Sequence, residues 1–463
     1  MKGPESKAAA IPALTPRGKG HQFVLYGDSC SGVPGAPHER TFASVNAVLS
    51  RLSLQPEFIL FPGDEVIGLT SDPSMLRAQW QHWSEVEMAW LDRKETPLYH
   101  TTSNHTTYDT MSEQVFTEML PHLPRNGPSD QKGLSYFIRR DDLLLVFVNT
   151  CWSGLGGEGH VETDWLGATL RQHSDAKYKF VVGHHPVFPI NGFSGAYQRE
   201  IGPEHGPTFW ALLVEHNVFA YLCSHILAFD AQVHAGVLQI ASAGAGTAHR
   251  MPEDSEYLHA LQAALDEEGL RYQVLDIDGN IRERLSWPFA LPPQKAWKPL
   301  SPGVQSAPAW NKPEIVAWRF QGRLSDAGGG QQTLMSAWSE GSALAPLWIG
   351  FAGRDRRLSV IIGPTPGRSP HYWFGPSLPA GRPFDFELAL HTAMGPGGIL
   401  WRDADASSWT SLEGASAWGP ERIDWPVYWS LGHGKGGADD RPFAGTDLGA
   451  VCCSSQPYDL DVL

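Results

Sequence analysis

Five apolar runs of the chain each end in, or shortly before, a side chain that can bind a metal ion. These side chains are Asp28, Asp64, Asn104, His184 and His225. Carboxylate, amide oxygen and imidazole together suit a borderline divalent cation such as Zn, Mn or Fe. The residue types therefore predict a centre that holds one or two divalent ions.

The runs that precede these residues have the composition of buried strands. They include FVLYGD, FILFPGD, LLLVFVNT, KFVVGHHP, VFAYLCSH and VLQIASAGAG, which are rich in Val, Ile, Leu and Phe without strict alternation. Such runs are typical of strands that are covered on both faces. A helix is predicted to begin at Asp72-Pro73, with Asp as N-cap, and another is predicted over 163–173. This alternation predicts a layered α/β domain, in which ligands gather at the carboxyl ends of strands.

The sequence divides into four predicted parts. Residues 1–20 are expected to form a flexible N-terminal arm, and 21–290 the α/β domain. A proline-rich segment, 291–312, is expected to link this domain to a second one. Residues 313–463 carry short alternating runs between Gly, Pro and Asp turns, which predict an all-β sandwich.

Composition excludes several classes of protein. The net charge is −15, from 35 Lys and Arg against 50 Asp and Glu, which argues against a protein that coats nucleic acid. Five cysteines without CxxC spacing predict neither a disulfide framework nor a zinc ribbon. Neither a signal peptide nor a membrane-spanning run is recognisable, so a cytoplasmic protein is expected, or a secreted or periplasmic one if a signal has been removed.

The order of the polar motifs resembles one family. GD at 28, GD at 64, NH at 104–105, GHHP at 183–186 and SH at 224–225 resemble the calcineurin-like metallophosphoesterases, and among them the purple-acid-phosphatase-like branch. The resemblance covers about 21–250. It implies a four-layer α/β/β/α sandwich as the catalytic domain. It also implies hydrolysis of a phosphate mono- or diester by a metal-activated water.

The resemblance further implies a role for each residue. Asp64 would bridge two metal ions, and Asp28 would bind the first. Asn104, His184 and His225 would complete the second. His105 would donate to the phosphoryl or leaving-group oxygen. His185 either faces the substrate or packs against Pro186.

The sequence departs from the family at the first ion. Cys30 and Leu227 stand where the family usually has histidine, and Ile67 replaces the tyrosine of purple acid phosphatases. We prefer a mononuclear or weakly dinuclear site, and the first ion could recruit Cys30 as a thiolate. The first ion could also recruit another replacement ligand, or the domain could be degenerate and serve only to bind a ligand. The substitutes considered are Asp230, His234 and His38.

The C-terminal region resembles the concanavalin and laminin-G type of sandwich, at the level of pattern. Its tryptophans could stack on a sugar or nucleobase, or could fill the core. These tryptophans are Trp373, Trp401, Trp409, Trp418, Trp425 and Trp429. The expected partner is a small phosphate ester or a glycan-linked substrate. The alternatives to a phosphoesterase are a noncatalytic glycan-binding or ligand-binding protein and a hydrolase of another ester, such as a sulfate ester.

Overall fold

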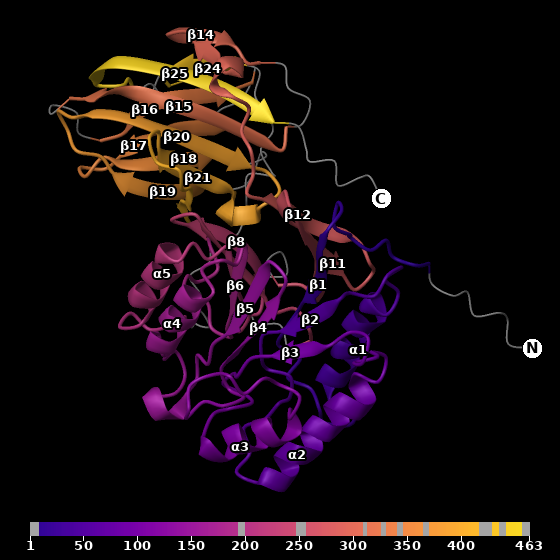
Figure 1. Cartoon of the computed structure of the whole chain (residues 1–463). Coiled ribbons are helices and arrows are strands. Elements are labelled where there is room, and N and C mark those ends of the chain that lie inside the picture. The colour runs from indigo at the N-terminus through magenta and orange to yellow at the C-terminus, as the bar shows by residue number, and fades with distance from the viewer. Residues whose placement is uncertain are drawn as a thin grey trace, which may run out of the picture.

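The computed structural model describes most of the chain as two bodies joined end to end (Figure 1). The described residues are 9–192, 200–246, 256–308, 313–325, 330–339, 346–363, 370–415, 428–434 and 441–455. The N-terminal body combines two sheets with helices, and the C-terminal body consists of two sheets packed face to face. This arrangement confirms the predicted fold class.

The N-terminal body contains two mixed, six-stranded sheets. The first has the order β12-β11-β10-β1-β2-β3 and the second the order β4-β5-β6-β7-β9-β8. The strands of the first sheet are β1 (Gly20–Leu25), β2 (Phe58–Phe61), β3 (Leu98–His100), β10 (His259–Asp266), β11 (Gly269–Asp276) and β12 (Ile281–Trp287). Those of the second are β4 (Tyr136–Arg140), β5 (Leu143–Phe147), β6 (Tyr178–Val182), β7 (Ala220–Cys223), β8 (Phe229–His234) and β9 (Val237–Ser242). All six runs predicted as buried strands overlap one of these strands.

Successive side chains along a strand point into two different hydrophobic cores. On β5, Leu145 and Phe147 belong to the cluster between the sheets, whereas Leu144 and Val146 belong to the cluster under helices α4 (Asp164–Gln172) and α5 (Gly206–Glu215). Phe23 of β1 meets Phe180 of β6 edge to face across the central layer, with ring centroids 5.9 Å apart. Because both faces of these strands are covered, the continuous apolar runs seen in the sequence are required.

Helices cover the outer face of each sheet. They are α1 (Pro37–Leu49), α2 (Pro73–His82), α3 (Thr110–Met119), α4 (Asp164–Gln172) and α5 (Gly206–Glu215). The predicted start of α2 is confirmed, because the Asp72 carboxylate accepts from the backbone N–H of Ser74 at 2.8 Å and Pro73 opens the helix. A π-helical turn, η1 (Trp83–Glu87), continues α2. The predicted helix over 163–173 is α4.

The C-terminal body is an antiparallel sandwich. One sheet has the order β13-β25-β15-β20-β21-β22 and the other β14-β24-β16-β17-β18-β19-β23. The first contains β13 (Lys298–Leu300), β15 (Ile315–Leu324), β20 (Pro383–His391), β21 (Ile399–Asp403), β22 (Thr410–Ser411) and β25 (Gly445–Ser455). The second contains β14 (Gly303–Ser306), β16 (Gln332–Trp338), β17 (Leu347–Ala352), β18 (Arg357–Ile362), β19 (His371–Ser377), β23 (Glu413–Gly414) and β24 (Tyr428–Leu431).

Two predicted segment boundaries are wrong. Part of the expected linker, 291–312, forms β13 and β14, which pair with β25 and β24 and so belong to the sandwich. The described part of the expected flexible arm, residues 9–20, packs on the first body: Leu14 is buried, and its N–H donates to the Gln262 side chain at 2.9 Å. In both segments, backbone groups and apolar side chains find partners that proline and glycine content does not reveal. Residues 1–8 lie outside the described part.

The two bodies share hydrophobic core. Phe289, at the end of the first body, contacts Trp409 and His391 of the second with ring centroids 5.3 and 5.8 Å apart. Ile315 and Ala317 of β15 belong to the same buried cluster as the sheets of the first body. The outer face of one sandwich sheet therefore packs on the N-terminal body, which fixes the two bodies together.

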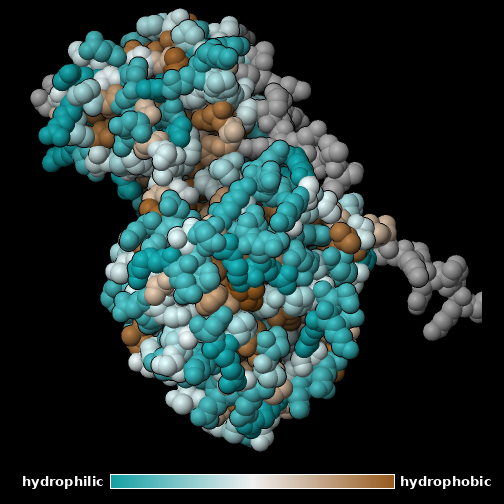
Figure 2. All heavy atoms as spheres, in the orientation of Figure 1, coloured by the Kyte–Doolittle hydropathy of each residue, from teal (hydrophilic) through white to brown (hydrophobic). Residues whose placement is uncertain are grey.

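The surface seen in Figure 2 is mainly hydrophilic, with hydrophobic residues in small groups. The large hydrophobic side chains that are exposed include Leu54, Leu69 and Val304, which lie far apart in the sequence. Scattered apolar residues of this kind are ordinary on a protein surface. Among the described residues, the helices are all too short or too polar to cross a membrane.

Candidate metal centre

The predicted ligands follow the carboxyl ends of parallel strands from both sheets of the first body. Asp28, Asp64 and Asn104 follow β1, β2 and β3, while His184 and His225 follow β6 and β7. The structure brings all five together where the two sheets meet, as the motif order predicts. This convergence explains why residues spread over almost 200 positions can form one site.

Four candidate residues hold left-handed backbone conformations. The φ angles are 66° at Asp28, 40° at Cys30, 57° at Asp64 and 67° at His225. Each such residue other than glycine costs about 1–3 kcal/mol and persists where the surrounding structure imposes it. The loops after β1 and β2 are fixed by backbone bonds, in which Asp28 donates to Gly63 at 3.1 Å and Cys30 donates to Asp64 at 2.7 Å. Strain of this kind is typical of functional sites.

The most complete group of donors comprises Asp64, Asn104, His184 and His225. Asn104 Oδ1 lies 2.9 Å from His184 Nε2 and 3.2 Å from His225 Nδ1. His225 Nδ1 lies 3.0 Å from His184 Nε2, which lies 3.5 Å from Asp64 Oδ1. Bonds of about 2.0–2.2 Å to one ion place neighbouring donors about 3.0 Å apart at right angles and about 3.4 Å apart at the tetrahedral angle. The observed separations match the ligand set of one divalent ion.

The protonation of His184 supports this interpretation. Its Nδ1 lies 2.8 Å from the Pro62 carbonyl oxygen and 3.1 Å from Ser224 Oγ, so Nδ1 carries the hydrogen that is donated to Pro62. In the neutral ring, Nε2 then presents a lone pair to Asn104 Oδ1, which is also an acceptor. Without an ion, the raised pKa of His184 places a second proton on Nε2, which donates to Asn104 Oδ1, and a divalent ion would take the place of that proton. A hydrogen bond such as that from Nδ1 to Pro62 is characteristic of metal-binding histidines.

The electrostatics of the centre favour positive charge. Burial and the neighbouring Asp64 carboxylate raise the pKa of Asp28 to about 7. Burial raises the pKa of Asp64, but the imidazoles of His184 and His105 overcome this effect and hold it well below its usual range. Burial lowers the pKa of His184, but Asp64 more than offsets it, and the pKa is raised to about 9. Two buried carboxylates therefore create a strong preference for a cation, as a divalent ion would supply.

Two glycines allow the loops of the site to approach closely. A Cβ on Gly63 would lie 2.6 Å from Ser103 Cβ and 2.8 Å from His184 Nδ1. A Cβ on Gly68 would coincide with the backbone of His105, only 1.6 Å from its carbonyl oxygen. Both glycines have positive φ, of 98° and 54°. Glycine at these positions is therefore needed to place His184 and His105.

His105 lies at the edge of the centre and is partly exposed. Its backbone N–H donates to Asp64 Oδ1 at 3.2 Å, and its Nδ1 lies 2.8 Å from the Ile67 carbonyl oxygen. A donor nitrogen of His105 also lies within 4.8 Å of Cys30 Sγ and an Asp64 carboxylate oxygen. The ring is thus held by its backbone and by Nδ1, which leaves Nε2 for other contacts.

Cys30 points into the centre. Its buried Sγ lies 3.8 Å from Asp64 Oδ2. The other carboxylate oxygen, Asp64 Oδ1, faces His184. Bonds of about 2.3 Å to sulfur and 2.1 Å to oxygen place those two ligands about 3.6 Å apart around a tetrahedral zinc. The geometry therefore suits a thiolate ligand at the position where the family has histidine. Leu227 is half-buried and offers no donor.

His185 lies beside His184 and His225, and one ring nitrogen from each of the three residues lies within 4.8 Å of the other two. The side chain is fully buried, and its Nδ1 lies 2.9 Å from Thr150 Oγ1. Burial lowers the pKa of His185 to about 4, so the ring is neutral at pH 7. Its Nε2 has no hydrogen-bond partner among the described residues and lies 3.6 Å from Glu158 Oε1. The same Glu158 oxygen lies 3.8 Å from His225 Nε2.

Sequence reasoning missed Glu158. It belongs to the glycine-rich segment GLGGEGH at 154–160, which has neither the hydrophobic pattern of a strand nor a motif of the family. The one available signal is the density of glycines in a loop that directly follows β5. Such loops allow the backbone to fold close to a site.

The other residues that were considered as replacement ligands of the first ion have different surroundings. His38 Nδ1 lies 2.9 Å from the backbone oxygen of Cys30, not from its sulfur. Asp230 and His234 belong to β8, where the Gln232 side chain donates to Asp230 at 2.7 Å and lies 2.8 Å from His234 Nε2. The structure therefore favours Cys30 over these three residues as the substitute.

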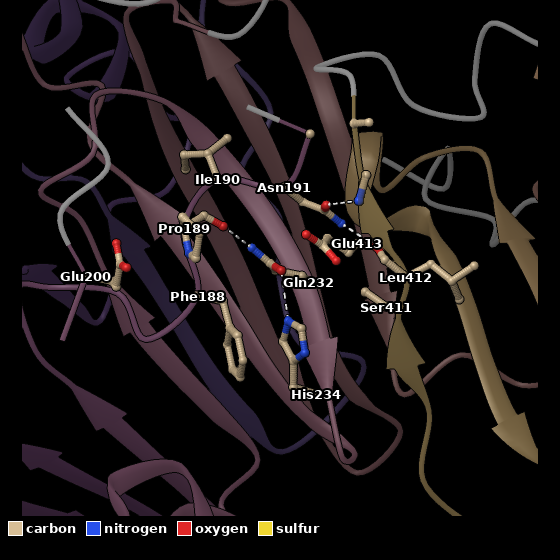
Figure 3. Close-up of a pocket in the computed structure, with 13 residues that line it drawn as sticks. Phe188, Pro189, Ile190, Asn191, Glu200, Gln232, His234, Ser411, Leu412 and Glu413 are labelled. Carbon is tan, nitrogen blue, oxygen red and sulfur yellow. Dashed lines mark hydrogen bonds between the residues drawn. The ribbon is translucent and has the colours of Figure 1, made fainter. Parts of the chain in front are cut away.

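His234 instead lines a pocket of about 680 Å³ between the two bodies (Figure 3). Its ring stacks on Phe188 with centroids 3.5 Å apart. The opposite wall is formed by Ser411, Leu412 and Glu413 of the sandwich. This pocket is separate from the metal centre, because none of the five predicted ligands lines it.

The tryptophans of the sandwich pack rather than stack on a ligand. Trp373, Trp409 and Trp429 are at most 7% exposed, and Trp401 is partly buried against the sandwich core. The interpretation of these four as an exposed aromatic platform is therefore wrong, because their area fills the cores of the sandwich and of the junction. Trp418 and Trp425 lie outside the described residues.

Comparison with solved structures finds similar folds at low identity. GAP50, described as the anchor in the inner membrane complex of Plasmodium, is 14% identical over 58% of this chain and 89% of that protein, with a TM-score of 0.40. The purple acid phosphatase PPD1 of yellow lupin, Lupinus luteus, is 12% identical over 60% of this chain, with a TM-score of 0.41. Vps29 of Entamoeba histolytica, in complex with zinc, is 10% identical over 57% of this chain and 98% of that protein, with a TM-score of 0.27.

The chain spans 55% of the length of the lupin protein. No family model matches the chain, and no curated protein matches it.

Proposed function

We propose that this protein is a metal-dependent hydrolase of phosphate mono- or diesters. The observation that carries the proposal is the convergence of Asp64, Asn104 and His184, together with His225, at separations of 2.9–3.5 Å. Two imidazole nitrogens, an amide oxygen and a carboxylate oxygen that converge in this way form a ligand set that suits a divalent ion.

The residues present fit one or two divalent ions, such as Zn, Mn or Fe. Asp64, Asn104, His184 and His225 would hold one ion. Asp28, Asp64 and Cys30 would hold a second, weaker one. When bound, such ions would polarise a phosphoryl group and lower the pKa of a nearby water molecule.

His105 supplies the proton chemistry in this proposal. Its Nδ1–H donates to the Ile67 carbonyl oxygen, so a second proton on the ring must reside on Nε2. The imidazolium can then donate that proton to the leaving-group oxygen while its backbone N–H stays on the Asp64 carboxylate. General acid catalysis of this kind contributes about 10²–10⁴-fold to a rate.

His185 is proposed as a positioning residue rather than as a group that touches the substrate. Its ring packs against that of His225 with centroids 4.2 Å apart, and Thr150 holds its Nδ1. A buried, neutral ring in this position fixes the orientation of His225 and leaves Glu158 at the outer edge of the site.

A chromogen screen tests the proposal. The protein is stripped with a chelator, and the hydrolysis of p-nitrophenyl phosphate, bis-p-nitrophenyl phosphate and p-nitrophenyl sulfate is measured before and after Mn²⁺, Zn²⁺ or Fe²⁺ is returned. We expect a phosphate ester to be cleaved only with metal. Cleavage of the sulfate ester alone, or full activity in the stripped protein, would contradict the proposal.

The His105→Gln variant separates metal binding from proton transfer. It should keep the metal content of the wild type and lose about 10²-fold or more in rate, with the greatest loss for the substrate whose leaving group is most basic. A variant that keeps the full rate would remove His105 from the mechanism.

A further inference from the structure

A second group of potential metal ligands lies on two loops beside the centre. It consists of His160, Glu204 and His205, and their donor atoms all lie within 4.8 Å of one another. His160 follows the glycine-rich segment after β5, and His205 is the N-cap of α5. None of the three residues belongs to the centre described above.

The orientation of His160 suits metal binding. Its Nδ1 lies 3.1 Å from the carbonyl oxygen of Glu158, so Nδ1–H donates there and Nε2 presents its lone pair on the other side. That Nε2 lies 3.7 Å from Glu204 Oε1, beyond hydrogen-bond distance. The ring of His205 meets the ring of His160 edge to face, with centroids 4.9 Å apart. A carbonyl that fixes the tautomer of a histidine is typical of metal ligands.

The separation of the donors fits an ion of the zinc type. Bonds of about 2.0–2.2 Å at a tetrahedral angle place nitrogen and oxygen ligands about 3.4 Å apart. The 3.7 Å between His160 and Glu204 needs a shift of only a few tenths of an ångström. Two imidazoles and one carboxylate are also a common donor set for zinc with one open position.

Another group in the chain provides a contrast. Glu39, His82 and Glu87 are equally close together. There, however, His82 Nε2 lies 2.8 Å from Glu39 Oε1, and Glu87 accepts from Ser31 Oγ and the Gly32 N–H. The donors of this group are used in hydrogen bonds. Those of His160 and Glu204 approach each other without such a bond.

The two loops are already held together by their backbones. Gly202 donates to the Gly159 carbonyl oxygen at 3.2 Å, and Gly159 donates to the Thr150 carbonyl oxygen at 3.0 Å. Ligands from both sides of this contact are therefore pre-positioned. We propose that His160, Glu204 and His205 form a second binding site for a divalent transition ion, with zinc as the best match.

This site has a direct connection to the proposed catalytic centre through Glu158. The Glu158 carbonyl oxygen accepts from His160, and its carboxylate lies 3.6 Å from His185 and 3.8 Å from His225. An ion held by His160 would restrain this loop and keep the Glu158 carboxylate beside the two imidazoles. This consequence rests on the proposed function, whereas the metal site itself does not.

Zinc stoichiometry tests the site. Four proteins are stripped, titrated with Zn²⁺ alone and measured by elemental analysis: the wild type, His160→Gln with His205→Gln, the control His82→Gln, and His184→Gln with His225→Gln. We expect the His160/His205 double variant to bind one equivalent fewer than the wild type, and His82→Gln to bind the same amount. An unchanged stoichiometry in the double variant, or an equal loss in His82→Gln, would overturn the proposal.

The His184/His225 double variant separates this proposal from the catalytic one. It should lose metal from the central site and retain the equivalent bound by His160. Retention in this variant supports the second site even if no phosphate ester is cleaved. If the variant binds no zinc at all, the second site is refuted.

Glu204→Gln provides a test that does not depend on replacing a partly buried ring. The Glu204 side chain is 58% exposed, so the substitution should leave the fold intact. We expect Glu204→Gln to bind one zinc ion, the one that the His160/His205 double variant loses, about tenfold or more weakly than the wild type. Zn²⁺ should also raise the unfolding temperature of the wild type more than that of Glu204→Gln. Equal affinities and equal shifts would contradict the assignment.

Discussion

At the metal centre and at the junction between the two bodies, the chain buries polar side chains to a similar extent, but it satisfies them in different ways. At the junction, the Asn191 amide donates to the Pro396 and Leu412 carbonyl oxygens at 3.2 and 3.0 Å and accepts from the Gly414 N–H at 2.6 Å. At the centre, Asn104 Oδ1 faces two imidazole nitrogens beside the Asp64 carboxylate. A completed set of hydrogen bonds indicates a structural role, whereas converging acceptors indicate a ligand.

The largest effect is expected at the centre. Asn104→Ala or His225→Ala should remove bound metal and lower activity by about 10³-fold, because each removes one of four donors from a preorganised electrostatic site. The fold should persist, since no apolar core is lost. Elemental analysis, steady-state kinetics and circular dichroism of the same preparations check this. A variant that retains full activity without metal would refute the assignment.

The matched change at the junction is expected to have the reverse outcome. Asn191→Ala should lower the free energy of unfolding by about 2–4 kcal/mol, because the Leu412 carbonyl oxygen and the Gly414 N–H lose the bonds that Asn191 makes, whereas the Pro396 carbonyl oxygen keeps Trp373 Nε1 as a donor. Metal content should be unchanged. Denaturant unfolding and elemental analysis measure the two effects. If Asn191→Ala lost metal while Asn104→Ala lost stability, the comparison between the two regions would be wrong.

The free energy of unfolding is expected to depend on pH through Asp230, which lies near the junction. Burial raises the pKa of Asp230 to about 7, and its Oδ1 has no hydrogen-bond partner among the described residues. A raised pKa in the folded state means that stability is greatest below the unfolded pKa of about 4 and is lost as the pH rises through about 7. Relative to Asp230→Asn, the wild type should therefore lose about 4 kcal/mol between pH 4 and pH 8, because the pKa in the folded state lies about three units above its ordinary value.

Unfolding free energies of Asp230→Asn and the wild type, measured across this range, test the prediction. The informative quantity is the change in their difference with pH, because a constant offset would reflect only the new amide. A difference that stays constant from pH 4 to pH 8 would show that Asp230 has an ordinary pKa.

The smallest effect is expected at the first ion, where Cys30 replaces histidine. Cys30→Ala should weaken the binding of this ion, as a second equivalent of metal, about tenfold. It should leave the ion held by Asn104, His184 and His225 unchanged, because the Cys30 sulfur would bind only one of the two ions whereas Asp64 would bind both. Restoring the family pattern with Cys30→His and Leu227→His should strengthen that equivalent. Cys452→Ala is the control, since Cys452 is buried in the core of the sandwich. Equal effects of the two alanine variants would exclude Cys30 as a ligand.

Much of the first body could be predicted from the sequence, for a physical reason. Strands buried on both faces leave continuous apolar runs, and their carboxyl ends are marked by Asp64, His184 and His225. Three further strands of the first sheet, β10–β12, were not recognised. They lie at its antiparallel edge, where polar residues such as Arg271 and Gln273 interrupt the apolar pattern.

The parts that sequence reasoning missed depend on contacts between distant segments. Pro299 and Leu300 become a strand because β25, about 150 residues later, supplies their hydrogen-bonding edge. Glu158 joins the site because glycines let its loop fold back onto His185 and His225. The local sequence around Leu300 and around Glu158 does not indicate which distant residues each segment will contact. Neither placement can therefore be derived from the sequence alone.

The central claim is that the converging acceptors at Asn104 hold a divalent ion that is needed for the cleavage of a phosphate ester. The most direct test measures metal content and phosphate-ester hydrolysis together, in the wild type and in Asn104→Ala, after both proteins have been stripped and reloaded. We expect metal and activity to return together in the wild type and neither to return in the variant. Equal metal content in the two proteins, or equal hydrolysis without metal, would contradict it.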